Sequence, residues 1–190
     1  MSIILFLGSS VKEYIEKSAG MIQEHIQNGS LRCETCTKPM KHHSNYTRGI
    51  KETGEKIPIT VVRCVTCPKW HALLPDFILP GKHYSGNEVE SVIIDSAAVP
   101  IGEIETEASE PTVRRWISQT GEKLKQAAGA LKYHFGRIGK AISETVITPG
   151  TAYSELEQIL EKAPRAVKNS GNKLGLANIW LGATGIGAYI

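Results

Sequence analysis

Two short stretches, CETC at residues 33–36 and CVTC at residues 64–67, contain every cysteine of the 190-residue chain. Each Cys-x-x-Cys turn directs two thiolates to one point, and two such turns supply the four sulfurs of a tetrahedral zinc site. The spacing therefore predicts that Cys33, Cys36, Cys64 and Cys67 bind Zn²⁺. Four protein ligands leave no open coordination position, so we expect the metal to stabilise the fold and not to catalyse a reaction.

The alternative interpretation of these cysteines is two redox pairs or free thiols in a core. A redox Cys-x-x-Cys favours the start of a helix in a βαβ context, which neither pair shows. Disulfides are the weaker interpretation because a cytosolic chain keeps its thiols reduced. One of four nearby histidines could replace a cysteine or hydrogen-bond a ligand, although such residues more often are solvated or contact phosphate. These histidines, His42, His43, His71 and His83, are left out of the predicted ligand set.

Residues 1–82 are predicted to form an N-terminal strand, a helix and a zinc ribbon with four cysteine ligands. The apolar run at residues 3–7 indicates a buried strand, and it lacks the basic region that precedes the core of a signal peptide. A capping box at Ser10 begins a helix with apolar residues every three or four positions, which Asn28-Gly29 ends. Before the second cysteine pair, Ile57, Ile59 and Val61 alternate as in a half-buried strand.

Residues 83–147 are predicted to form a helix-turn-helix unit with a long basic helix. A capping box at Ser85, a short segment after Pro100 and an N-cap at Ser109 suggest three short helices. An apolar stripe with basic residues between its members predicts a further helix over residues 121–147. Residues 148–190 are predicted to be a C-terminal helical tail. The fold class is therefore α+β, with the strands first and the helices after them.

Charge is segregated along the predicted helices. Residues 85–110 hold seven acidic residues and no Lys or Arg, whereas residues 111–145 hold seven basic residues against two acidic ones. Arg and Gln side chains read guanine and adenine edges, and hydroxyl groups at a helix N-terminus suit phosphate oxygens. The alternative is an amphipathic helix with a solvated basic face. The predicted DNA contacts are Ser109, Thr112, Arg114, Arg115, Gln119 and Lys123.

Five segments in a fixed order resemble a family of uncharacterised bacterial proteins from mobile elements. They are CxxC at residues 33–36, VVRCxxC at 61–67, LPDFxxP at 74–80, Tyr84-Ser85, and SxPTVRRW at 109–116. This family is described as a zinc-ribbon domain and is similar to the N-terminal zinc-ribbon and helix-turn-helix region of some insertion-sequence transposases. The resemblance covers roughly residues 30–140. The resemblance implies a DNA-binding role. A two-metal nuclease needs a cluster of carboxylates, and because the chain has only two aspartates, Asp76 and Asp95, we do not expect a transposase nuclease here.

The sequence therefore predicts a non-catalytic, zinc-dependent protein that binds double-stranded DNA, as an accessory or targeting factor in transposition or as a regulator. Implied partners are a transposase, an integrase or an AAA+ ATPase of the same element. We expect a cytoplasmic, nucleoid-associated bacterial protein with no membrane partner. The alternative is a zinc-ribbon adaptor that binds another protein and no nucleic acid. RNA binding is a variant of the first prediction, in which Tyr46, Trp70 and Tyr84 stack on bases.

Overall fold

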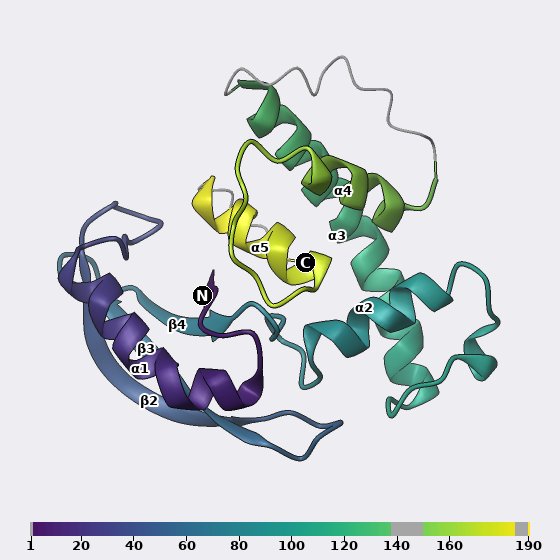
Figure 1. The fold of residues 1–190 in the computed structure, drawn as a ribbon, viewed down its shortest axis with the longest axis horizontal. Coiled ribbons are helices and arrows are strands. Elements are labelled where there is room, and N and C mark those ends of the chain that lie inside the picture. The colour runs from purple at the N-terminus through teal and green to yellow at the C-terminus, as the bar shows by residue number, and fades with distance from the viewer. Residues whose placement is uncertain (1, 138–149, 185–189) are drawn as a thin grey trace.

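The computed structural model describes residues 2–137, 150–184 and 190, and it has the predicted α+β architecture (Figure 1). The first part of the chain is a strand, a helix and three more strands, and the second part is helical. In chain order, the elements are β1 (Ser2–Leu5), α1 (Val11–Gln27), β2 (Met40–Gly49), β3 (Lys56–Cys64), β4 (Trp70–Pro75), α2 (Gly86–Asp95), a 3-10 turn η1 (Ile101–Glu103), α3 (Glu110–Arg137), α4 (Ala152–Glu161) and α5 (Lys173–Ala183).

The four strands form one sheet in the order β1-β4-β3-β2, with β1 parallel to β4 and the other pairs antiparallel. Helix α1 runs along β2 and β3 (Figure 1). The Ser10 hydroxyl caps α1 by accepting from the Glu13 amide, as the capping box predicts. At the start of α1, the buried Tyr14 hydroxyl donates to the Pro58 carbonyl of β3 at 2.5 Å. The predicted strand and helix before the ribbon are therefore confirmed.

The predicted alternation along β3 holds for its first half only. Ile57 and Ile59 are buried, but Val61 is half-buried and the next residue, Val62, is fully buried. Successive residues of a strand point to opposite faces. Apolar packing therefore covers one face of β3 near its start and the other face near Cys64, where the strand meets the cysteines.

The helical part differs from the predicted helix-turn-helix. Its second helix is a single 3-10 turn, because the chain turns extended at Ile104 and the Glu88 carboxylate of α2 binds Thr106 and the Glu107 amide. The third helix does not stop after one or two turns but continues as α3 for 28 residues. Burial of its apolar stripe offsets the cost of about 1 kcal/mol for each glycine inside a helix. Residues 138–147 of the predicted basic helix lie outside the described residues.

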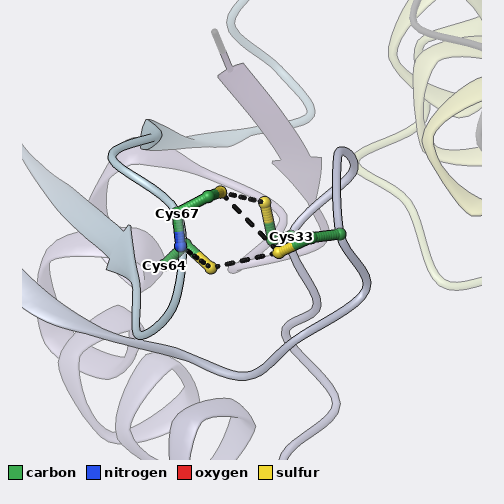
Figure 2. Close-up of side chains that lie close together, drawn as sticks. Cys33, Cys64 and Cys67 are labelled. Carbon is green, nitrogen blue, oxygen red and sulfur yellow. Dashed lines mark hydrogen bonds between the residues drawn. The ribbon is translucent and has the colours of Figure 1, made fainter.

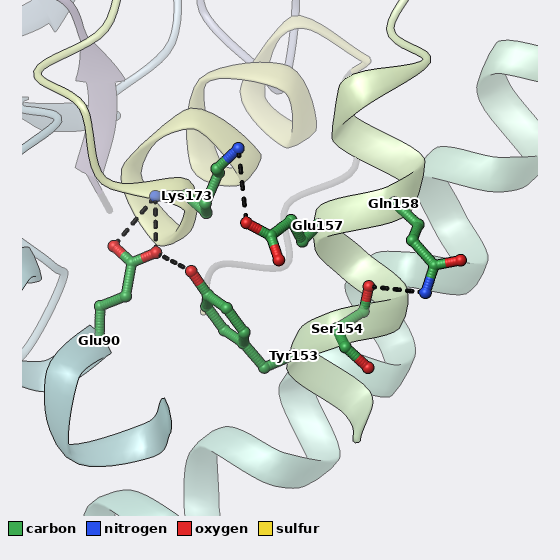
Figure 3. A network of polar contacts seen from close by, with 6 residues as sticks. All are labelled: Glu90, Tyr153, Ser154, Glu157, Gln158 and Lys173. Carbon is green, nitrogen blue, oxygen red and sulfur yellow. Dashed lines mark hydrogen bonds and ion pairs between the residues drawn. The ribbon is translucent and has the colours of Figure 1, made fainter. Parts of the chain in front are cut away.

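A buried carboxylate joins three of the helices. Glu90 of α2 accepts hydrogen bonds from the Lys173 backbone amide, at 2.9 and 3.0 Å, and from the Tyr153 hydroxyl (Figure 3). The Lys173 ammonium lies 3.7 Å from the Glu157 carboxylate. Burial raises the pKa of Glu90, although both hydrogen bonds oppose this effect. This network holds α4 and the start of α5 against α2.

The apolar core has two clusters along the chain. One surrounds the sheet and α1 and reaches Ile78, and the other begins at Leu79 and includes α2, α3, α4 and α5. Asp76 lies where they meet, and its carboxylate accepts from the Ser170 amide at 2.6 Å. The predicted domain boundaries at 82/83 and 147/148 stay a prediction. None of the helices in the described ranges is both long and apolar enough to cross a lipid bilayer.

Candidate functional site

Two similar turns bring the cysteines to one end of the sheet. Cys33 and Cys36 lie between α1 and β2, Cys64 ends β3, and Cys67 lies in the turn before β4. The Cys33 amide donates to the carbonyl five residues on, at 2.9 Å, and the Cys64 amide makes the same contact at 3.0 Å. The Val65 amide donates to the Pro39 carbonyl at 3.2 Å and so ties one turn to the other.

The four sulfur atoms converge on one point (Figure 2). The Sγ–Sγ distances are 3.5 Å from Cys33 to Cys67, 3.4 Å from Cys36 to Cys64, and 3.7 Å from Cys36 to Cys67. All four sulfurs lie within 4.8 Å of one another, and none is in a disulfide. The predicted grouping of the four cysteines is confirmed.

These distances fit a tetrathiolate metal centre. With metal–sulfur bonds of about 2.3 Å, the edge of a regular tetrahedron is about 3.8 Å, close to the separations found here. The two turns thus place the sulfurs almost as a bound ion would hold them. Each ligand is contributed by a loop that carries its own backbone hydrogen bonds, so the metal would join α1, β2, β3 and β4 at one end of the sheet.

The surroundings of the sulfurs favour thiolates at specific positions. The Cys67 and Thr66 amides donate to the Cys64 sulfur at 3.4 and 3.3 Å, and they lower the pKa of Cys64 to about 6. Burial and the neighbouring Cys33 and Cys64 sulfurs raise the pKa of Cys67 to about 12. Four adjacent thiolates repel one another, and a divalent cation supplies the charge that allows all four to be deprotonated.

One histidine lies beside the sulfurs. His71 is fully buried, and its Nε2 atom is 4.0 Å from the Cys33 sulfur. A ring N–H in this position donates to a ligand and orients it without binding the metal. The other ring nitrogen, Nδ1, has no hydrogen-bond partner in the described part of the chain. Of the four histidines considered from the sequence, His42, His43 and His83 are exposed and remain outside the sulfur cluster.

The residues predicted to contact DNA lie at or near the start of α3, but they do not form one surface. Arg115, Gln119 and Lys123 are exposed and recur every four residues, which places them on one face of the helix. Arg114 points about 100° away from Arg115 around the helix and pairs with Glu110, with Nε 2.9 Å from the carboxylate. The hydroxyls of Ser109 and Thr112 are 3.0 Å apart and contact each other at the start of α3.

A lysine that sequence reasoning did not single out completes this face. Burial and the charges of Lys123 and Arg115 lower the pKa of Lys82 from 10.5 to about 8. The half-buried Lys82 therefore lies within electrostatic reach of both cations of α3. We call Lys82, Arg115 and Lys123 the Lys82 cluster. No sequence signal could have found it, since Lys82 belongs to a turn and reaches α3 only through the tertiary fold.

Contacts on both sides hold the turn that carries Lys82. The Arg48 guanidinium of β2 donates to the carbonyl of Leu79, at 3.1 Å, and to that of Lys82. The Tyr84 ring packs edge-on against Trp116 of α3, with 4.9 Å between the ring centroids. Contacts from the sheet and from α3 thus hold the turn, and with it the backbone of Lys82, in place.

Comparison with protein families matches residues 33–116 to a domain of unknown function (DUF6431). The matched segment covers somewhat under half of the chain, from the first cysteine of the metal centre to Trp116. It therefore includes all four cysteines, the turn that carries Lys82, and the first part of α3. No curated protein and no solved structure was found to match the chain.

Proposed function

We propose that this chain is a non-catalytic DNA-binding protein in which Zn²⁺ holds the ribbon and the Lys82 cluster contacts the phosphate backbone. The observation that carries the proposal is the placement of exposed Arg115 and Lys123 on one face of α3 with Lys82 within electrostatic reach of both, none of the three in an ion pair with a carboxylate among the described residues. A fold that holds like charges together loses stability by doing so, and a polyanion removes this repulsion. The phosphates of DNA supply the matching charge.

The shape of α3 supports a duplex as the partner. Arg115 and Lys123 are eight residues apart, about 12 Å along the helix axis, with Gln119 midway between them. An α-helix with its side chains is about 10–12 Å in diameter, which fits the major groove of about 12 Å. On this surface Lys82 and the two α3 cations would contact phosphates, while Gln119, between the two, would face the base edges. Arg114, which Glu110 already pairs, would contribute little to binding.

Zinc is the metal we propose for the tetrathiolate centre. An ion with four thiolate ligands has a closed coordination shell, which is typical of structural zinc. Zinc has no redox chemistry, in keeping with a structural role. The bacterial mobile-element context, with a transposase, integrase or AAA+ ATPase as partner and the nucleoid as location, belongs to this proposal and is supported by the family resemblance alone.

The test is duplex binding as a function of salt, measured by fluorescence anisotropy with a labelled duplex of mixed sequence. For B-DNA, the slope of log K against log[salt] is about −0.9 per phosphate contact. The double variant Arg115→Gln with Lys123→Gln should bind more weakly and lower the magnitude of the slope by about 2. The matched control is Arg114→Gln, one residue away on the same helix, which should leave the slope unchanged.

Three outcomes are informative. An unchanged slope in the double variant would move duplex binding to another surface. A larger loss in Arg114→Gln than in the double variant would contradict the division of the helix faces. Absence of duplex binding by the wild-type protein, together with stable co-purification of another protein, would support the adaptor function instead.

A further inference from the structure

The sheet carries a second cationic surface at the metal end, and this surface includes an exposed aromatic side chain. Trp70, the first residue of β4, is 58% exposed, whereas Trp116 and Trp180 are 1% and 4% exposed. Single exposed apolar side chains are common and carry no meaning by themselves. The neighbours of Trp70 make this one informative.

Strand pairing places two cations in a row with this tryptophan. Trp70 is directly opposite Arg63 of β3, and Arg63 is directly opposite Lys41 of β2. Directly opposed residues share a face of the sheet, and strands lie about 4.8 Å apart, so the row is about 10 Å wide. Both cations are exposed, and in the described ranges neither forms an ion pair. An anion could therefore bind to both cations without displacing a carboxylate of the described residues.

A strand irregularity adds a second ring to the row. The pairing register of β2 shifts between His42 and Ser44, which leaves His43 as the extra residue. Such bulges redirect a side chain and often lie next to functional sites. Here the His43 ring lies over Trp70, with 4.6 Å between the ring centroids and 37° between the ring planes. The ring contact orients the indole and still leaves more than half of it accessible. We call Lys41, His43, Arg63 and Trp70 the Trp70 patch.

The metal centre fixes the position of this patch. Cys67 is three residues before Trp70, and the Cys64 amide donates to the Lys69 carbonyl at 3.0 Å, directly before Trp70. Lys41 and Arg63 are likewise within one residue of Met40 and Cys64, the paired residues at the metal end of β2 and β3. The aromatic ring and the two cations are thus held on strands that the metal turns join together.

We propose that the Trp70 patch binds single-stranded nucleic acid, with an unpaired base stacked on Trp70 and the adjoining phosphates against Arg63 and Lys41. An exposed aromatic ring beside cations on a sheet suits this ligand, because every base has a π-face and every nucleotide a negative charge. Bases inside a duplex are already stacked, so the surface favours an unpaired strand. Tyr46 and Tyr84 are not part of it: Tyr46 pairs with Ile59 farther along the sheet, and Tyr84 is buried against Trp116.

The proposal extends the nucleic-acid binding proposed above to a second surface, and it does not require the Lys82 cluster. Titration of the zinc-loaded full chain with the oligonucleotide (dT)15 should quench its tryptophan fluorescence, because Trp70 is the accessible one of the three tryptophans. Trp70→Ala should abolish the quenching and weaken binding about tenfold, the effect of losing one stacked base. Trp70→Phe should restore most of the affinity, since it keeps an aromatic face.

Tyr133→Ala provides a matched control, because Tyr133 is an exposed aromatic residue of α3 outside the patch. It should bind (dT)15 as the wild type does. The zinc content of Trp70→Ala should equal that of the wild type, which shows that the metal end is intact. Tighter binding of (rU)15 than of (dT)15 would assign the unpaired strand to RNA, and the reverse would assign it to DNA.

Equal affinities of the wild type and Trp70→Ala for both oligonucleotides would overturn the proposal. The Lys82 cluster is tested separately, since Arg115→Gln with Lys123→Gln should weaken duplex binding and leave the (dT)15 quenching in place. Duplex binding by the wild type without (dT)15 quenching would show that the Trp70 proposal is wrong, and quenching without duplex binding would show that the Lys82 proposal is wrong.

Discussion

Replacing one cysteine ligand should unfold the sheet end of the protein and leave the helical core largely in place. Cys64→Ser is the most informative change, because Cys64 ends β3 and its sulfur accepts two backbone hydrogen bonds. Structural zinc contributes an apparent free energy of about 10–16 kcal/mol in small zinc domains. This is comparable with the total stability of about 5–15 kcal/mol of a typical domain. Loss of the metal should therefore remove most of the stability of the sheet end.

The expected result is local. Helices α2, α3, α4 and α5 share an apolar cluster of their own, which includes none of the four cysteines. Hydrogen exchange should therefore accelerate over β2, β3 and β4 in Cys64→Ser, while the amides of α3 around Trp116 and Leu124 stay protected. Zinc content, measured by mass spectrometry of the metal, should fall from one ion per chain to much less than one.

Thr66→Ala is the matched control, because it changes the same turn and keeps the backbone amide that donates to Cys64. It should retain zinc and wild-type exchange rates. The reasoning is refuted if Cys64→Ser loses its metal and yet β2, β3 and β4 exchange as slowly as in the wild type. It is also refuted if α3 and the sheet lose protection together, since the two clusters would then unfold as one unit.

Three further changes test individual contacts. Lys82→Met should raise Tm at pH 7 and weaken duplex binding. In the wild type, the pKa of Lys82 is about 8 in the folded state and 10.5 in the unfolded state, so the free energy of unfolding should rise with pH between these values, as the folded state loses its unfavourable charge. Glu90→Ala should destabilise the protein by about 2 kcal/mol in urea unfolding, because the Tyr153 hydroxyl and a backbone amide lose their acceptor; an unchanged midpoint would contradict the role of this network. Gly175→Ala should destabilise by about 1–3 kcal/mol, since its new Cβ would lie 2.2 Å from the Asp76 carbonyl oxygen; wild-type stability would mean that α5 can shift away.

The sequence was sufficient wherever a local rule decides the structure. Ser10 and Ser85 cap helices as their spacing predicts, because the bond from hydroxyl to amide depends on only four residues. The two cysteine pairs could also be recognised from the sequence, because the geometry of a Cys-x-x-Cys turn is local. Only the convergence of the two turns on one point depends on the tertiary fold. The start of α4 follows the same local rule, since the Thr151 hydroxyl accepts from the Ser154 amide.

The sequence failed where long-range packing decides. Nothing around Ile101 shows that its segment forms only one 3-10 turn, because the extended chain after it is held by Glu88, which lies in another helix. Nothing in residues 109–117 shows that this helix merges with the basic stretch after residue 121, since the stripe that continues it is buried by α4 and α5. The same limit hid the Lys82 cluster and the row of cations beside Trp70, both of which exist only through tertiary and cross-strand contacts.

The Trp70 patch lies at one end of β2, and the turn that carries Lys82 is held from the other end of this strand, so the two cationic surfaces should depend differently on the metal. Lys41 of the Trp70 patch and Arg48, which holds the turn of Lys82, are seven residues apart on β2, or about 23 Å along the strand. The patch is held by the metal turns, whereas the Lys82 cluster is also held by Tyr84 against Trp116 in the helical core. Removal of the metal should therefore eliminate the binding of an unpaired strand first and reduce duplex binding only in part. A chelator titration that abolishes both activities at the same metal occupancy would show instead that the ribbon and α3 act as a single surface.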